Sequence, residues 1–445
     1  MLQNKKILLI QQYLSEDKNV PPVFPLGLAY IASAVEKIGW EVNVIDLNIY
    51  DYPYQTLSNT LLNFSPNVVG ISLRNIDNVD YDNFTYYYEE LPTTLKVIKN
   101  INCRLPIIVG GSGFSIFPEQ IMKFNPEFDY GVFLEGEETI VELLNHLDNP
   151  KQVKGIYYRD QKQILFTGRR EFLDFNTTPI PNRKFFQMDK YNYPLCIGVQ
   201  SKRGCMLNCS YCTYIHLNGV NVRLRTAVSV VDEVEILQKN YNILEIIFAD
   251  NIFNIPDFHA KEILNELLKR KIKIKWSAWF DVKTINQEFI DIAKHAGCYR
   301  MCFSTDGITS ETLKALMKNI NEDDIKKLLI LCKNNPDIDF RFSLFALPPK
   351  QTIKGLFKTI SFVLKTHLLM KNSKCLVSWI RLYPNTELLN QINCIENLLP
   401  KSIKKSNEHS LFFTNSNFSK YIIAIYRQIL NCINHLRRVR KIIIR

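Results

Sequence analysis

Three cysteines lie close together in one short segment of the chain. "RGCMLNCSYC" covers 203–212 and places Cys205, Cys209 and Cys212 in a C-x3-C-x2-C pattern. A structural zinc ion takes four protein ligands, and His216 follows closely enough to complete a Cys3His site. A chance group of structural cysteines is a second interpretation. We favour a third, an iron–sulfur cluster held by three thiolates, because the iron without a cysteine stays open to a substrate or cofactor.

The composition restricts the class of protein. The chain has 445 residues, of which 46% are hydrophobic and 22% charged, as expected for a globular protein of two or three domains. The eight other cysteines are dispersed and read as buried small side chains. Neither a secretory leader nor an apolar run of membrane-spanning length is evident. We therefore expect a cytoplasmic protein with reduced thiols.

The net charge of +11 leaves a nucleic-acid partner open. The basic residues are mostly lysines spread along the chain, and only the end at 435–445 is densely basic. We therefore expect neither nucleic-acid binding nor a membrane span.

Strands and helices alternate on both sides of a short irregular segment. Apolar runs and helical spacing predict a doubly wound parallel sheet within 1–150, a hairpin and proline-containing linker at 151–194, and six βα-type units at 195–392. Six units suit a partial barrel, in which catalytic residues gather at the carboxyl ends of the strands. Cys205 directly follows the first of these strands. A helical basic tail is expected at 393–445.

The cysteine segment and three later segments resemble one enzyme family. The C-x3-C-x2-C motif with Tyr211 before its last cysteine resembles the radical S-adenosylmethionine (radical SAM) enzymes. "FADNIF" (248–253), "CFSTDGITSETLKALMK" (302–318) and "IRLYPNTEL" (380–388) resemble segments that follow in that order. The resemblance implies a [4Fe-4S] cluster whose open iron binds S-adenosylmethionine and cleaves it to a 5′-deoxyadenosyl radical.

The same resemblance implies cofactor contacts for two carboxylates. It places Asp250 near the active site. Asp306 stands where the family usually carries a glutamate directed at the ribose of S-adenosylmethionine, so this chain departs from the pattern there.

The first 150 residues resemble cobalamin-binding domains of the same superfamily. The similar segments are 21–46, 68–73, "IIVGGSG" (107–113) and "FLEGEETIVELL" (133–144). The cobalamin contacts that this resemblance implies are Gly110, Gly111, Ser112, Glu135 and Gly136. The D-x-H-x-x-G string that often supplies a cobalt ligand is absent. Either cobalamin binds without a protein histidine, which we favour, or the domain is a scaffold.

Arg74 follows a strand of this first domain. "RNIDN" (74–78) is similar to tryptophan 2-C-methyltransferases, and a permanent cation here could face the lower side of the cobalt and disfavour an axial ligand. An exposed arginine in a polar loop is the alternative interpretation.

The resemblances together imply a cobalamin-dependent radical SAM methyltransferase. Such an enzyme moves a methyl group from S-adenosylmethionine through methylcobalamin to carbon or phosphorus of a small-molecule or peptide-derived substrate. It needs an electron donor such as flavodoxin or ferredoxin. Two alternatives stay open: a radical rearrangement or cyclisation without methyl transfer, and a zinc- or nucleic-acid-binding protein that is not an enzyme.

Overall fold

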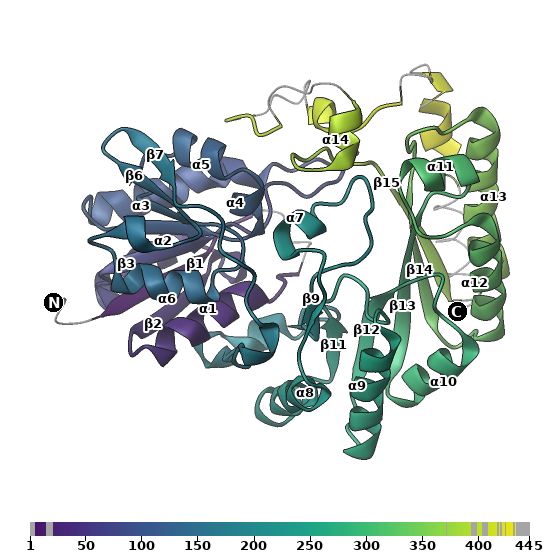
Figure 1. Ribbon diagram of the computed structural model, residues 1–445, viewed down its shortest axis with the longest axis horizontal. Helices are drawn as coiled ribbons and strands as arrows, with labels where there is room; N and C mark the ends of the chain where they lie inside the picture. Colours follow the sequence, from purple (N-terminus) through teal and green to yellow (C-terminus); the bar gives the residue numbers. More distant parts are fainter. Residues whose placement is uncertain are drawn as a thin grey trace.

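The computed structural model describes residues 5–14, 21–370, 372–392, 398–402, 408–415, 418, 421–422, 424–429 and 432. It contains two α/β units that lie side by side (Figure 1). The expected basic end at 435–445 and most of the expected helical tail lie outside the described residues.

The first unit is a seven-stranded sheet in the order β2-β1-β3-β4-β5-β6-β7. Its strands are β1 (Lys6–Gln11), β2 (Glu41–Asp46), β3 (Val68–Ser72), β4 (Ile107–Gly110), β5 (Tyr130–Val132), β6 (Ile156–Asp160) and β7 (Gln163–Phe166). The first five are parallel, and the predicted hairpin β6–β7 extends the sheet antiparallel at one edge. This hairpin lies in the stretch predicted as hairpin and linker (151–194), so the sheet of the first unit reaches beyond residue 150.

Helices cover both faces of this sheet. α1 (Leu26–Lys37) and α6 (Glu137–Asn145) pack on one face, where Val35 and Leu143 are fully buried. The opposite face is covered by α2 (Pro53–Phe64), α3 (Leu91–Ile101), α4 (Ser112–Ile116) and α5 (Pro118–Phe124). The strand order reverses between β1 and β3, and ligands of doubly wound sheets bind at the carboxyl ends of such strands.

The second unit is a six-stranded parallel half-barrel in the order β15-β14-β13-β12-β11-β8. Its strands are β8 (Gly198–Val199), β11 (Glu245–Phe248), β12 (Lys275–Phe280), β13 (Cys298–Asp306), β14 (Asp339–Phe345) and β15 (Ser373–Ser378). The helices that follow them are α8 (Ala227–Tyr241), α9 (Asp257–Lys269), α10 (Gln287–His295), α11 (Ser310–Ala315), α12 (Glu322–Asn334) and α13 (Ile353–Leu369). The six predicted strands are therefore present, with both α11 and α12 following β13, and the helices line the outer side of the curved sheet (Figure 1).

Buried ion pairs join the two units. Arg203, on the short strand β9 (Lys202–Arg203), donates to Glu137 at 2.6 Å and pairs with Glu135 at 3.2 Å. Arg223, on β10 (Arg223–Leu224), donates to Glu135 at 2.7 Å. Because both carboxylates belong to the first unit and both arginines flank the cysteine segment, this cluster fixes that segment against the first unit.

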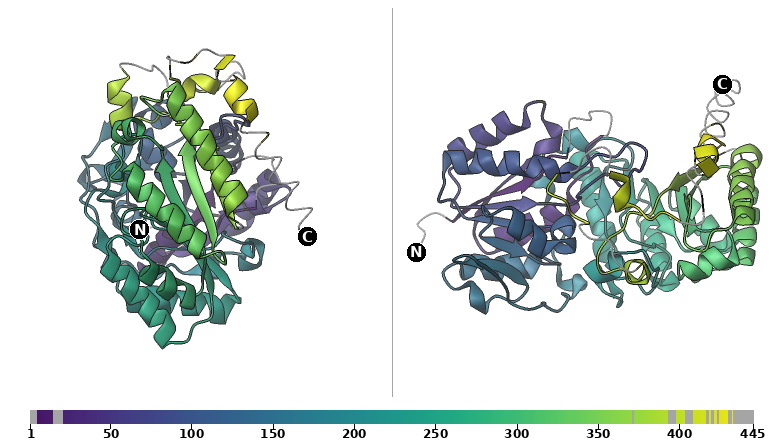
Figure 2. Two further views of the ribbon diagram at one scale, coloured as in Figure 1. Left: turned by 90° about the vertical axis from the view of Figure 1, so that its right-hand side faces the viewer. Right: turned by 90° about the horizontal axis from the view of Figure 1, so that it is seen from above.

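The chain beyond β15 returns across the top of the molecule. α14 (Glu387–Gln391) lies above the space between the two units, as the view from above also shows (Figure 2). Leu388 donates its backbone N–H to the carbonyl of Ser210 at 2.7 Å. This late segment therefore packs directly on the cysteine loop.

Candidate active site between the two domains

The cysteine loop follows β8 and β9 at the carboxyl edge of the half-barrel. Gly204 starts it with φ of +92°, and a Cβ there would lie 2.0 Å from the carbonyl oxygen of Asn221. The Cys205 N–H donates to the carbonyl of Gly219 at 3.0 Å, and the Cys212 N–H to that of Cys209 at 3.1 Å. The loop ends at the short helix α7 (Tyr214–Asn218). Backbone bonds thus hold all three cysteines in one loop.

The three thiols are partly buried and free of disulfides. Burial raises the pKa of each, and the pKa of Cys212 reaches about 12. Thiolate repulsion adds to this effect, because Cys209 raises the pKa of Cys205, and both raise the pKa of Cys212. A bound cation would remove this cost, because a metal ion binds the deprotonated thiolate. The donor set therefore fits a metal group with a sulfur preference.

The geometry does not favour a single zinc ion. Within the described part of the chain, no group of three or more His, Cys, Asp or Glu side chains lies close enough to hold one metal ion. Zinc–sulfur bonds of about 2.3 Å require thiolates within about 4 Å of one another. The His216 ring instead lies near Phe133 and 3.4 Å from the carbonyl oxygen of Ser115. His216 therefore does not join the three cysteines as a fourth ligand in this structure.

A polar network joins the cysteine loop to β13. Asp306 accepts hydrogen bonds from the Tyr211 hydroxyl at 2.5 Å, the Lys318 ammonium at 2.7 Å and the Ser304 hydroxyl at 2.8 Å. Asp306 is 1% exposed and has a φ of +61°. Its carboxylate is therefore committed to the loop and to Lys318. The expected contact between Asp306 and a ribose stays a prediction.

Asp250 is similarly occupied. It accepts hydrogen bonds from the Ser201 hydroxyl at 2.5 Å and from the backbone N–H groups of Ser201 and Lys202 at 2.8 and 3.3 Å. These bonds fix the turn that leads into Cys205. In this structure Asp250 thus positions the loop, and direct contact with S-adenosylmethionine stays a prediction.

The carboxyl edge of the first unit contains the residues predicted to contact cobalamin. Gly111 has a φ of +97°, and a Cβ there would lie 2.7 Å from the carbonyl oxygen of Leu73. The Ser112 hydroxyl donates to the carbonyl of Arg74 at 2.7 Å, and the Leu73 N–H donates to the carbonyl of Gly110 at 2.8 Å. The loops after β3 and β4 are therefore bound tightly together.

Arg74 extends from this edge. Arg74 is exposed to solvent. Desolvation by surrounding protein nevertheless lowers the pKa of its guanidinium, and Asp46 raises it. The placement of Arg74 beside cobalamin therefore stays a prediction, as does the alternative of an exposed arginine in a polar loop.

Glu135 and Gly136 have other partners. Glu135 accepts from Arg203, from Arg223 and from the backbone N–H of Leu173. A Cβ at Gly136 would lie 2.8 Å from the Cδ1 atom of Ile31 on α1. The contacts of Glu135 hold the two units together, and Gly136 allows α1 and α6 to approach closely. Both follow β5 at the same sheet edge as Gly110 to Ser112, and their contact with cobalamin stays a prediction.

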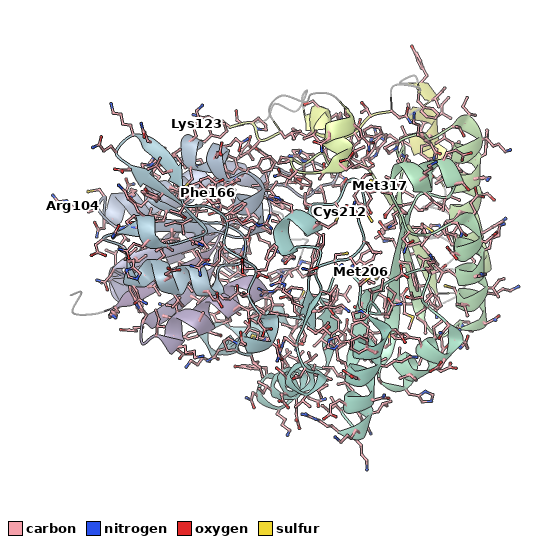
Figure 3. The ribbon with its side chains drawn as sticks, in the orientation of Figure 1. Arg104, Lys123, Phe166, Met206, Cys212 and Met317 are labelled. Carbon is pink, nitrogen blue, oxygen red and sulfur yellow. The ribbon has the colours of Figure 1, made fainter. Side chains whose placement is uncertain are left out.

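Figure 3 shows the side chains of Met206, Cys212 and Met317 between the two units, whereas Arg104 and Phe166 lie on the first unit. Met206 is 60% exposed and Met317 39%. The sequence did not single out Lys318, although its side chain is only 9% exposed. Lys318 follows Asp306 by 12 residues, and no local sequence pattern predicts their contact. The contact forms because folding brings the segment after α11 back to the end of β13.

Family comparisons match both units. The family model described as "B12 binding domain" matches residues 20–144, and that described as "Radical SAM superfamily" matches residues 199–363. The chain is a radical SAM enzyme with a cobalamin-binding domain. The prediction from the sequence is thereby confirmed at the level of family and domain order.

Individual relatives agree with this assignment. An uncharacterized methyltransferase (PH0819) of Pyrococcus horikoshii is 29% identical over 303 residues, which is 66% of this chain and 63% of the relative. Cytidylyl-2-hydroxyethylphosphonate methyltransferase of Streptomyces wedmorensis is 25% identical over 78% of this chain and 73% of its own length. This radical SAM enzyme thus spans 63% and 73% of these two relatives.

A solved structure supports the fold of this radical SAM enzyme. The methyltransferase TsrM from Kitasatospora setae, with tryptophan and a SAM analogue bound, superposes with a TM-score of 0.78 at 22% identity. The match covers 87% of this chain and 76% of TsrM. Among the described residues of the present enzyme, no helix is both long and apolar enough to cross a membrane.

Proposed function

We propose that this enzyme is a cobalamin-dependent radical SAM methyltransferase acting on an unactivated carbon or a phosphorus of a small-molecule or peptide-derived substrate. The observation that carries the proposal is the joining of a three-cysteine loop to a cobalamin-type domain through the buried Arg203–Glu137 pair. The named relatives that are methyltransferases support the same activity.

Each group of residues has a defined task in this proposal. Cys205, Cys209 and Cys212 hold the cluster, and Asp250 and Asp306 fix the loop that carries them. Gly110, Gly111 and Ser112 contact cobalamin at the carboxyl edge of the sheet, and Arg74 places a cation beside it without offering a metal ligand. When bound, the cluster supplies the electron that cleaves S-adenosylmethionine and cobalamin carries the methyl group. The cluster must itself receive this electron, and we propose a reduced flavodoxin or ferredoxin as its donor. Such donors imply a cytoplasmic location.

Anaerobic reconstitution tests the proposal. The full-length enzyme is loaded with iron, sulfide and hydroxocobalamin, desalted, and analysed for metals. We expect about four irons per chain, as a [4Fe-4S] cluster requires, together with cobalt. The triple variant C205A/C209A/C212A loses the iron, whereas C103A, which changes an exposed cysteine of the first unit, keeps it.

The other interpretations give different outcomes. Iron without cobalt leaves a radical enzyme whose first unit is a scaffold. A product of unchanged mass, with both cofactors present, indicates rearrangement or cyclisation. Zinc without iron overturns the proposal.

A further inference from the structure

The inner face of the half-barrel is polar and accessible. Along β14 the side chains of Phe340, Phe342 and Leu344 are buried against the outer helices, and the alternate positions are half-buried on the other face. β13 alternates in the same way, with Met301 and Phe303 directed outward. The half-buried inner positions of the two strands are Arg300, Cys302, Ser304, Arg341, Ser343 and Phe345.

Strand register brings two arginines of this face together. Ser277 pairs with Arg300 across β12 and β13, and Cys302 pairs with Arg341 across β13 and β14. Arg300 Nε and Arg341 Nη2 donate to the same oxygen, Asp339 Oδ2, at 2.7 and 2.6 Å. One carboxylate therefore serves two guanidinium groups, which leaves one positive charge in excess.

Two polar atoms of this face lack a partner. Ser277 is 1% exposed, and its hydroxyl makes no hydrogen bond among the described residues. Arg341 Nε is buried and, within the same set, also has no acceptor. Buried donors without acceptors are costly. The cost is removed if a ligand supplies acceptor oxygens at this place.

We propose that Arg300, Arg341 and Ser277 bind an anionic group of the substrate, a carboxylate or a phosphoryl group. The planar guanidinium fork suits both groups. This inference rests on the proposed function, because it assigns the substrate class of the same active site.

The position of the arginines indicates how far the anionic group lies from the cysteine loop. Phe345 lies four residues beyond Arg341 on β14, about 13 Å at the rise of a strand. The Phe345 ring contacts that of Tyr211 in the cysteine loop, with centroids 4.7 Å apart. The anionic group is therefore held about 13 Å below the cysteine loop, at the end of the substrate remote from the reacting atom.

Trp279 provides a direct measurement on the full-length chain. It pairs with Cys302 in the strand register and is partly exposed on the inner face. The other three tryptophans, Trp40, Trp276 and Trp379, are 4%, 0% and 7% exposed. Trp279 is therefore the tryptophan whose fluorescence a quencher in solution reaches most easily. The ratio of iodide quenching to quenching by neutral acrylamide reports the local anion concentration beside Trp279, and the W279F variant shows which part of the fluorescence comes from Trp279.

We expect the iodide-to-acrylamide ratio of the quenching constants to fall about twofold in R300Q and in R341Q, the effect of removing one charge at about 10 Å in water. R341K keeps the ratio. R104Q, which changes an exposed arginine of the first unit, also keeps it. Inorganic phosphate or acetate protects wild-type Trp279 from iodide. Stronger protection by phosphate identifies a phosphoryl substrate, and stronger protection by acetate a carboxylate.

The inference is wrong if neither anion protects wild-type Trp279, a result that needs no variant to fold. An unchanged ratio in both folded glutamine variants contradicts it as well. Iron and cobalt analysis of the same preparation separates the two proposals. If the enzyme binds both cofactors but no anion protects Trp279, the proposed function stands and this inference fails. If an anion protects Trp279 but the chain binds zinc and no iron, the proposed function fails and the anion site stands.

Discussion

Asp77 and Arg381 are 304 residues apart in sequence and form a buried ion pair, with Arg381 Nε 2.9 Å from Asp77 Oδ2. The two side chains are 0% and 2% exposed. Asp77 belongs to "RNIDN" and Arg381 to "IRLYPNTEL", two segments that the sequence singled out separately. Arg381 also donates to the backbone carbonyls of Leu398 and Leu411. The pair thus ties the loop beside Arg74 to the segment that closes over the cysteines.

Breaking this pair is expected to destabilise the enzyme. In D77N a buried guanidinium loses its counter-charge, which costs about 3–5 kcal/mol. Denaturant unfolding measures the loss. D82N is the matched control, because Asp82 lies in the same loop and pairs with Arg427 in an exposed position, where about 1 kcal/mol or less is expected. Equal losses in the two variants would contradict the structural role of the pair.

Lys318 is expected to be necessary for a stable cysteine loop. K318Q leaves the buried Asp306 carboxylate without its cation, again at a cost of about 3–5 kcal/mol, and Asp306 holds Tyr211 between two of the cysteines. We expect less iron per chain after reconstitution and faster bleaching of the cluster absorbance. K314Q changes an exposed lysine of α11 and should match the wild type. Full iron content in K318Q with unchanged bleaching would refute this role.

Gly204 tests the geometry of the loop entrance. G204A places a methyl group 2.0 Å from the Asn221 carbonyl oxygen, so the β9–β10 hairpin must separate and Cys205 must shift. We expect loss of most of the iron. G168A has a similar φ of +88° with nothing within 4 Å of its Cβ, and it should cost only about 1 kcal/mol of backbone strain without affecting iron. Similar iron contents in the two variants would show that the close contact is tolerated.

His259 makes the stability depend on pH. Its pKa is lowered to about 4, mainly by burial and also by the charge of Lys202, against the opposing effect of a hydrogen bond to the Ser201 carbonyl. A histidine of the unfolded chain takes up its proton near pH 6.5. The unfolded state therefore binds more protons between pH 6.5 and 4, and stability falls as the pH falls through that window, by roughly 3 kcal/mol in total.

Urea midpoints measured from pH 7 to 4 check this dependence. H259Q should lose part of the slope, whereas H295Q, an exposed histidine on α10, should keep it. An identical slope in the wild type and H259Q would assign the acid sensitivity to other groups.

The sequence was most informative where the signal is local. Apolar runs and alternation predicted a parallel sheet within 1–150, and β1, β2 and β3 lie there, because strand patterns depend on near neighbours. The cysteine spacing likewise indicated the cluster loop, since its ligands lie within eight residues. The hairpin within 151–194 was also predicted from local pattern, but only the pairing of β5 with β6 shows that it extends the sheet of the first unit.

The roles of charged side chains were decided by tertiary packing. Glu135 pairs with Arg203 and Arg223, which follow it by 68 and 88 residues, while its expected contact with cobalamin stays a prediction. No periodicity encodes such a partner, because it depends on how the two units dock.

The sequence by itself thus determined the two α/β units, their order and the three thiolates. Only the tertiary structure decided which charged side chains are free to bind a ligand. Asp250 and Asp306 are committed to the cysteine loop, whereas Arg74 remains accessible and Arg300 and Arg341 share a single carboxylate. The physical reason is that local patterns fix secondary structure, while the availability of a charge depends on every group that folding places within hydrogen-bond distance.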